Sequence, residues 1–109
     1  MGRFRNGNKF SAVMTVVDGI KFRSKAEAKR YGELLLLAKA GQIRALVLQP
    51  KYPLHVKEWK IGAYVADFAY IDQAGRQVVE DVKGFKTTIY KWKKRHVEAE
   101  HGITITEIR

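Results

Sequence analysis

The stretch Tyr64–Gly84 reads YVADFAYIDQAGRQVVEDVKG and decides the fold that we expect for this chain. Two segments within it, residues 64–71 and 77–83, are rich in the β-branched and aromatic residues typical of strands. The turn-forming residues 72–76 separate them, and Gly75 suits the left-handed position of a three-residue loop. The stretch therefore predicts an antiparallel β-hairpin.

The length of the loop determines which side chains face each other across this hairpin. A three-residue loop places Asp67 opposite Asp81, because each step back along one strand matches one step forward along the other. A two-residue loop would instead place Asp67 opposite Glu80. In either register two carboxylates meet on a partly apolar hairpin, where like charges directly opposite each other destabilise the pairing.

A divalent cation between Asp67 and Asp81 would remove this repulsion. Mg²⁺ (or Mn²⁺) binds through one or two carboxylates, keeps several waters and meets substrate phosphates. Lys83 lies on the same face as Asp81, since side chains alternate along a strand. Its ammonium would orient or deprotonate an attacking water, or stabilise charge in the transition state. The alternative is an edge hairpin whose charges simply face water.

The remaining sequence predicts a single α/β domain over residues 10–109, with a mixed β-sheet and helices packed against it. Residues 1–9 are expected to form a flexible basic arm. The other expected elements are a hairpin over residues 12–22 that turns at Asp18-Gly19, a helix from Ser24 to Ala40, a strand over residues 43–56, a helix from Thr87 or Thr88 to about His101, and a strand over residues 103–108. Pro50 and Pro53 interrupt the strand over residues 43–56, which is therefore expected to be bent or to lie at an edge of the sheet.

The charge balance favours a polyanionic partner. The 109 residues include 21 Lys and Arg against 11 Asp and Glu, which gives a net charge of +10. The surplus is concentrated in residues 1–30 and 83–95, where aromatic residues lie among the lysines. Neutralisation of phosphates with release of counterions drives binding of such proteins to nucleic acid. The alternative is that these lysines are only solvated helix faces.

Several classes of protein are not expected. Cysteine is absent, which excludes disulfides and cysteine-based zinc sites. The chain has neither an apolar run long enough to span a membrane nor a signal-peptide pattern at its start, so we expect a cytoplasmic protein, in the host cell if it is phage-encoded. No small-molecule cofactor is expected.

The second helix combines an apolar stripe with a basic face. Ile89, Trp92 and His96 recur at helical spacing and are expected to pack on the sheet. Tyr90 or Trp92 would alternatively stack on an exposed base, although core packing is favoured for Trp92. His96 is interpreted as a surface or hydrogen-bonded histidine before a base or metal ligand. The residues expected to contact DNA phosphates are Lys25, Lys86, Lys91, Lys94 and Arg95.

Glu27 has two possible roles. It lies on the buried stripe of the first helix with Tyr31 and Leu34, where a carboxylate needs a partner. It also lies three residues after Ser24, as in a capping box in which the glutamate accepts a hydrogen bond from the Ser24 amide. The capping role is slightly favoured by the residues alone.

The order Asp67, turn, Asp81-Val82-Lys83 resembles the motif of the PD-(D/E)XK nuclease superfamily. Ala66 stands where the proline of that motif would precede Asp67. The resemblance extends over nearly the whole chain, to a small phage-associated branch similar to Holliday-junction resolvases. The segments that carry it are Asp18–Ala28, Gly41-x-Ile43, Leu48-Gln49, Tyr64-x-Ala66-Asp67-Phe68 and Val79–Gly84.

The resemblance implies a restriction-endonuclease-like αβββαβ core and Mg²⁺-dependent hydrolysis of phosphodiester bonds. It implies that Asp67 and Asp81 hold the metal and that Lys83 serves catalysis. It also implies that Glu27, the acidic residue on the first helix, is a catalytic residue and a further metal ligand. Gln49 lies where related enzymes carry a polar residue near the metal. An ordinary polar residue before Pro50 is the alternative.

The expected substrate is branched or otherwise structured DNA, since a chain of 109 residues has little room for a separate sequence-reading domain. A homodimer is expected, because resolution of a junction needs two cuts. Two alternatives remain: a non-catalytic nucleic-acid-binding module, and a nuclease subunit of a recombination or transposition complex.

Overall fold

A computed structural model describes residues 15–109, and its centre is a four-stranded mixed sheet. The predicted arm and the start of the predicted N-terminal hairpin lie outside the described residues. The first three strands of the sheet are antiparallel neighbours and the fourth is parallel to the third. In spatial order they are β3 (Arg44–Leu48), β6 (Phe68–Ile71), β7 (Gln77–Val82) and β8 (Ile105–Ile108).

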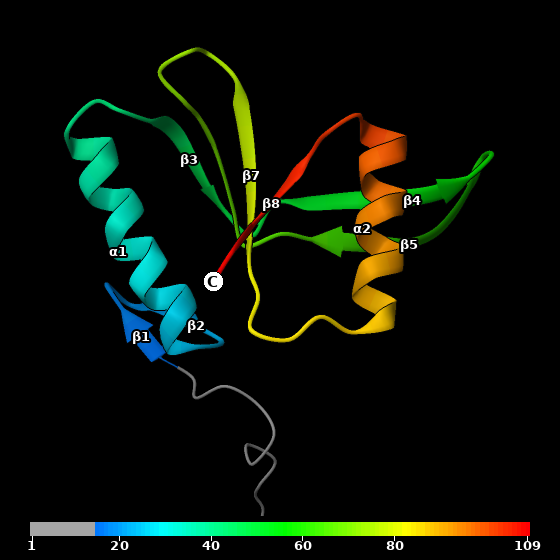
Figure 1. Ribbon diagram of the computed structural model, residues 1–109, viewed down its shortest axis with the longest axis horizontal. Coiled ribbons are helices and arrows are strands. Elements are labelled where there is room, and N and C mark those ends of the chain that lie inside the picture. Colours follow the sequence, from blue (N-terminus) through cyan, green and yellow to red (C-terminus); the bar gives the residue numbers. More distant parts are fainter. Residues whose placement is uncertain (1–14) are drawn as a thin grey trace, which may run out of the picture.

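A helix and a hairpin cover each side of the central strands (Figure 1). On one side lie α1 (Lys25–Lys39) and the hairpin of β1 (Thr15–Val17) and β2 (Ile20–Phe22). On the other side lie α2 (Thr88–His101) and the hairpin of β4 (Lys51–Val56) and β5 (Trp59–Val65). The expected mixed α/β architecture with helices packed on a sheet is confirmed.

Local capping explains where both helices begin. The Ser24 hydroxyl accepts a hydrogen bond from the Glu27 amide at 3.0 Å, and the Thr87 hydroxyl accepts one from the Tyr90 amide at 3.0 Å. Such contacts satisfy amides that have no partner within the helix. The α2 helix ends at Gly102, whose φ of 67° is the left-handed conformation that glycine adopts readily.

Two apolar clusters lie on opposite faces of the sheet, because side chains alternate along each strand. The α1 side is built around Phe22, Tyr31, Leu34, Phe68 and Tyr70. The α2 side is built around Leu54, Tyr64, Val79, Val97 and Ile105.

Glu80, one of the charged residues of β7, lies fully buried on the α1 side of the sheet. The Arg30 guanidinium donates to both of its carboxylate oxygens, at 2.8 and 2.7 Å. The Tyr70 hydroxyl donates to the same carboxylate. A bidentate pair of this kind has the geometry that compensates the desolvation of both charges. Glu80 therefore fixes α1 to the sheet.

The predicted strand over residues 43–56 is two strands in different sheets. β3 ends at Leu48 and β4 begins at Lys51, and between them Gln49 has a φ of 53°. The segment that pairs with β3 and β4 is interrupted at the same level, because residues 66–67 separate β5 from β6. The register is nevertheless the same on both sides of the break, since Leu48 pairs with Phe68 and Lys51 with Val65. The expected bend is thus confirmed at Pro50, where the whole two-stranded ribbon leaves the central sheet.

The prediction that the apolar stripe of α2 packs on the sheet is wrong for Ile89 and Trp92, whereas His96 is partly buried against His55 of β4. Ile89 and Trp92 are 69% and 74% exposed. The packed face of α2 is instead the one that carries Tyr90 and the fully buried Val97. The helix is rotated about its axis relative to the prediction, because the cluster around Val97 fills the space above the sheet.

Candidate active site

The bend in the ribbon positions Asp67. The loop after β6 has the predicted form, since Gly75 has a φ of 81° and the Asp72 amide donates to the Arg76 carbonyl at 2.9 Å. Phe68 consequently pairs with Glu80, and Asp67 is level with Asp81, so the three-residue-loop register is confirmed.

Asp67 itself lies just before β6, at the break rather than within a strand. Its backbone carbonyl accepts from the Gln49 amide at 2.9 Å, across the ribbon. Its carboxylate accepts from the Val82 amide of β7 at 2.7 Å. The Asp67 side chain therefore joins β7 at the point where the ribbon departs from it.

Asp81 is a buried carboxylate that has no hydrogen-bond partner within the described residues. It is 1% exposed, and within residues 15–109 neither of its carboxylate oxygens accepts a hydrogen bond. Burial raises its pKa to about 6, and the nearby charges of Lys83 and Arg23 only partly oppose this effect. An ionised carboxylate in such a place is costly unless a cation binds it.

Glu27 is a second buried carboxylate, 3% exposed, at the start of α1. Its Oε1 accepts from the Arg23 amide at 3.0 Å, so the reciprocal contact with the Ser24 amide that a capping box requires is replaced by one to the preceding residue. Its Oε2 is buried and has no hydrogen-bond partner among the described residues. Burial, followed by the neighbouring Asp67 carboxyl group, raises the pKa of Glu27 to about 7.

Arg23 connects the acidic residues and had no signal in the sequence. Its guanidinium lies 3.5 Å from Asp67 Oδ1 although the side chain is 64% exposed, and its positive charge lowers the pKa of both Asp81 and Glu27. A single arginine among 21 basic residues is not distinctive, which is why it was missed. Arg23 is thus the cation that the chain itself supplies to this cluster.

A cleft of about 350 Å³ opens next to Asp81, between the bent ribbon and the start of α2. Asp81 and Lys83 line it from the end of β7, and Arg23 lines it from the end of β2. Tyr64 lines it from β5, and its buried hydroxyl has no hydrogen-bond partner in the part of the chain that the structure describes. We call this the carboxylate cleft. Its wall also includes Lys93 of α2.

Lys83 and Tyr90 form the α2 side of the carboxylate cleft. The Lys83 ammonium lies 4.6 Å from the centre of the Tyr90 ring, a cation–π geometry that orients it. The Tyr90 hydroxyl donates to Glu107 Oε2 at 2.8 Å, and burial raises the pKa of that phenol. Lys83 and Asp81 therefore share the cleft, as their common strand face predicts.

Two lysines predicted to contact DNA have a partner within the protein. Lys86 lies 2.8 Å and Lys94 3.4 Å from the Glu107 carboxylate. Lys86 and the Tyr90 hydroxyl lower the pKa of Glu107 to about 2. Glu107 pairs with Asp81 across the β7–β8 register, so these lysines neutralise an acidic neighbour of the cleft.

The other predicted site residues lie in varied surroundings. Lys25, Lys91 and Arg95 are exposed. Gln49 is exposed beside Asp67, to which its amide donates. His96 Nε2 lies 2.9 Å from the His55 carbonyl oxygen, so the interpretation of it as a hydrogen-bonded histidine is confirmed.

The unpartnered oxygens are the observation that decides whether a cation fits. Asp81 offers two buried oxygens, and Asp67 lies at the same level of the hairpin. Within residues 15–109, no group of three or more His, Cys, Asp or Glu side chains is arranged as a metal cage. The Glu27 carboxyl group lies next to that of Asp67, which contributes to its raised pKa. The residues therefore fit an ion such as Mg²⁺, which needs one or two carboxylates and keeps several waters.

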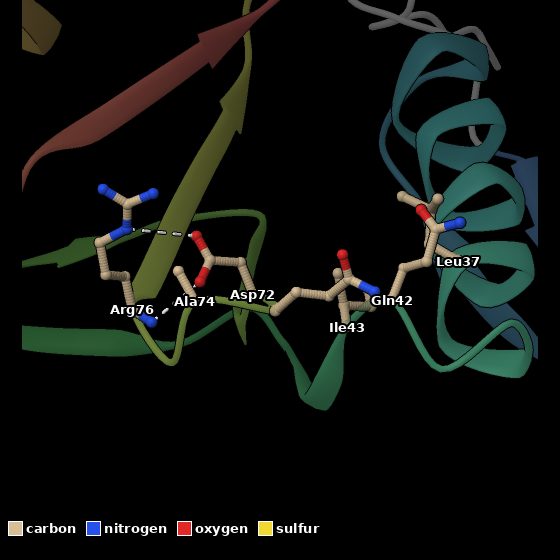
Figure 2. A pocket seen from close by; sticks show the side chains of 7 residues that line it. Leu37, Gln42, Ile43, Asp72, Ala74 and Arg76 are labelled. Atoms are coloured by element: carbon tan, nitrogen blue, oxygen red, sulfur yellow. Dashed lines mark hydrogen bonds and ion pairs between the residues drawn. The ribbon is translucent and has the colours of Figure 1, made fainter.

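A second cavity, of about 340 Å³, lies at the opposite end of the β6–β7 hairpin (Figure 2). It lies between Leu37 and Gln42 at the end of α1 and the loop that carries Asp72 and Arg76. The Asp72 carboxylate accepts from the Arg76 amide at 2.9 Å and pairs with its guanidinium. With its carboxylate already paired, this cavity lacks the unpartnered groups of the carboxylate cleft.

The fold and the cleft define a mixed α/β protein with a basic cleft beside the buried carboxylate of Asp81, which has no hydrogen-bond partner within residues 15–109. The chain belongs to the DUF1064 family, described as a protein of unknown function, and the match covers residues 7–106. Comparisons with curated proteins and with solved structures give no match. No helix in the described range is both long and apolar enough to cross a membrane.

Proposed function

We propose that this chain is a metal-dependent endonuclease that hydrolyses phosphodiester bonds in DNA. The observation that carries the proposal is the pair of buried Asp81 oxygens, which have no hydrogen-bond partner among residues 15–109, in a cleft shared with Lys83. A protein retains a buried carboxylate without a partner most readily where a ligand supplies one. The basic groups around the cleft select a substrate with negative charge, and a phosphodiester satisfies this requirement.

Asp81 and Asp67 would hold the metal, with Glu27 as an acidic neighbour rather than a third ligand of one cage. When bound, Mg²⁺ would supply positive charge to the reacting phosphate and make water more acidic. The Lys83 ammonium, held against Tyr90, would stabilise negative charge that develops on the phosphate oxygens. Arg23 would move from Asp67 to the incoming phosphate, since its side chain is largely exposed.

The order of elements supports a restriction-endonuclease-like core for this proposal. With the β1–β2 and β4–β5 hairpins set aside, the chain runs α1, β3, β6, β7, α2, β8, which is the αβββαβ order that the resemblance to the PD-(D/E)XK nucleases implies. In that core Asp67 lies just before β6, and Asp81 lies near the end of the neighbouring strand β7. Branched or structured DNA remains the expected substrate, and a homodimer the expected assembly for cutting two strands.

The test is cleavage of supercoiled plasmid and of a four-way junction by the purified chain, with Mg²⁺ or Mn²⁺ and with EDTA. We expect metal-dependent nicking that is lost in Asp81→Ala and Lys83→Ala. Binding without cleavage in every metal would refute the enzyme. Cleavage that survives both substitutions would refute the site. Cleavage that requires a partner protein would identify the chain as one subunit of a larger recombination or transposition complex.

A non-catalytic nucleic-acid-binding module is the second candidate. The contact of Arg23 with Asp67 favours this candidate, because the Arg23 guanidinium then supplies the positive charge that a metal would otherwise supply. This candidate predicts that Mg²⁺ leaves both DNA affinity and thermal stability unchanged.

A further inference from the structure

The outward face of α2 carries large apolar side chains that no other described part of the chain covers. Ile89 and Trp92, one helical turn apart, line a hollow of about 470 Å³ together with Lys93. A second hollow, of about 170 Å³, joins Trp92 to Ile61 of β5. Ile61 is also more than half exposed, at 58%. We call Ile61, Ile89, Trp92 and Lys93 the Trp92 surface. A contiguous apolar surface of this kind on a soluble protein usually marks a binding site.

The Trp92 surface is continuous with the carboxylate cleft. Ile89 and Lys93 line both the hollow beside Trp92 and the cleft that contains Asp81. The Lys93 ammonium donates to the Ala63 carbonyl at 3.3 Å, which holds this positive charge where the two regions meet. An extended ligand that reaches Asp81 would therefore pass Lys93 and lie over Trp92.

The charge of the protein indicates what this ligand is. Lys91 and Arg95 are exposed on α2 beside Trp92, and Lys60 is exposed on β5 beside Ile61. A second copy of the chain, with its own net charge of +10, would bring like charges together around this patch. A nucleic-acid strand with unpaired bases offers both phosphates for the lysines and flat apolar base faces for the indole ring. A fully paired duplex keeps those base faces within its own stack.

We propose that the Trp92 surface binds the unstacked bases of a nucleic-acid strand whose phosphate lies in the carboxylate cleft. The inference rests on the proposed function for the nature of the polymer. It narrows the substrate to DNA that has unpaired bases next to the point of cleavage, as at the branch point of a branched molecule. A base stacks on the indole ring of Trp92, and Lys93 contacts a phosphate between Trp92 and the carboxylate cleft.

The test uses tryptophan fluorescence in EDTA, so that no cleavage takes place. The chain has two tryptophans, and Trp59→Phe leaves Trp92 as the only one. The three ligands are a thymidine oligonucleotide, an abasic oligonucleotide of the same length and a fully paired duplex. We expect the thymidine strand to quench Trp92 and the other two to leave it nearly unchanged. Equal quenching by all three would overturn the inference, because charge alone would then explain the signal.

Affinity measured by anisotropy of labelled DNA gives the second readout. A stacked base is worth roughly 1–3 kcal/mol, so Trp92→Ala should weaken binding of the thymidine strand by about 5- to 150-fold. It should leave the affinities for the abasic strand and the duplex unchanged, and Trp59→Ala, the matched control, should change none of the three. An equal loss for all three ligands would overturn the inference.

Sedimentation without DNA completes the test. A wild-type dimer that Trp92→Ala separates into monomers would show that a second copy covers the surface, which overturns the inference. Failure of the nuclease proposal is distinguishable, because the fluorescence and affinity results do not require catalysis. Metal-dependent cleavage of paired DNA without any quenching would retain the nuclease and reject this role of Trp92.

Discussion

Substitution of Asp81 by asparagine should stabilise the metal-free protein. The buried carboxylate has no hydrogen-bond partner within residues 15–109, and burial raises its pKa from 3.8 to about 6. Each pKa unit corresponds to about 1.4 kcal/mol, so the ionised group destabilises the fold by roughly 3 kcal/mol at most. Asparagine removes the charge but keeps a buried polar group. We therefore expect a gain of about 1–3 kcal/mol at pH 8 in EDTA, which is a rise in Tm of roughly 5–15 °C.

The sign of the pH dependence follows from the direction of the pKa change. Because the folded-state pKa of Asp81 is raised, the unfolded chain loses this proton first, and the penalty grows as the pH rises from about 4 to 6. Above pH 6 the penalty is complete, and near pH 4 it has nearly vanished. The advantage of Asp81→Asn should therefore be large at pH 8 and small at pH 4, as measured by urea unfolding at both values.

Metal and a matched control make the experiment decisive. Millimolar Mg²⁺ should stabilise the wild type at pH 8 and leave Asp81→Asn unchanged, since binding to the folded state alone raises stability. Asp72→Asn makes the same chemical change at the other end of the hairpin, where the carboxylate already has Arg76 as a partner, and it should be neutral or slightly destabilising. If Asp81→Asn were less stable than the wild type in EDTA at pH 8, a protein group must already satisfy the carboxylate, and the reasoning would be refuted.

Three further predictions concern other contacts. Arg30→Ala leaves the buried Glu80 carboxylate without its guanidinium and should cost about 3–5 kcal/mol in urea unfolding, with Arg30→Lys in between; a cost below 1 kcal/mol would mean that the pair does not hold the helix. Lys83→Met should abolish cleavage but leave DNA affinity in EDTA within about twofold, because the ammonium lies against a ring rather than on the exposed surface; wild-type turnover would contradict its role. Hydrogen bonds from His55 lower the pKa of Glu100 to about 2, so this contact stabilises the fold fully above the ordinary pKa of 4.5 and is lost as the pH falls through 2. Glu100→Gln should therefore reduce the pH dependence of the free energy of unfolding between these two values. An unchanged pH dependence would count against this role of the contact.

The structural features that depend on residues close together in the sequence are predicted correctly. The hairpin register depends on the loop that ends at Gly75, and the helix starts depend on Ser24 and Thr87, each a local choice. The pairing of Phe68 with Glu80 follows from that register, and it brings Asp67 close to the end of β7.

The errors concern the packing of whole elements. The α2 helix has apolar residues on two faces, one with Trp92 and one with Val97, and only the shape of the sheet beneath it determines which face is buried. The bend at Pro50 was visible, but which sheet each half of the strand joins depends on a partner strand distant in the sequence. Arg30, the partner of a buried glutamate, is one basic residue among many and carried no signal.

The bent ribbon connects the β4–β5 hairpin to the central sheet through one continuous pair of strands. Its outer half, the β4–β5 hairpin, contacts α2, and its inner half is part of the central sheet. Hydrogen bonds between Gln49 and Asp67 and between Ala66 and Pro50 hold the two strands together at the bend. A tilt of the outer hairpin must therefore rotate the peptide that carries the Asp67 carboxylate. A contact made far out on the hairpin would therefore change the position of that carboxylate, although it lies well away from it.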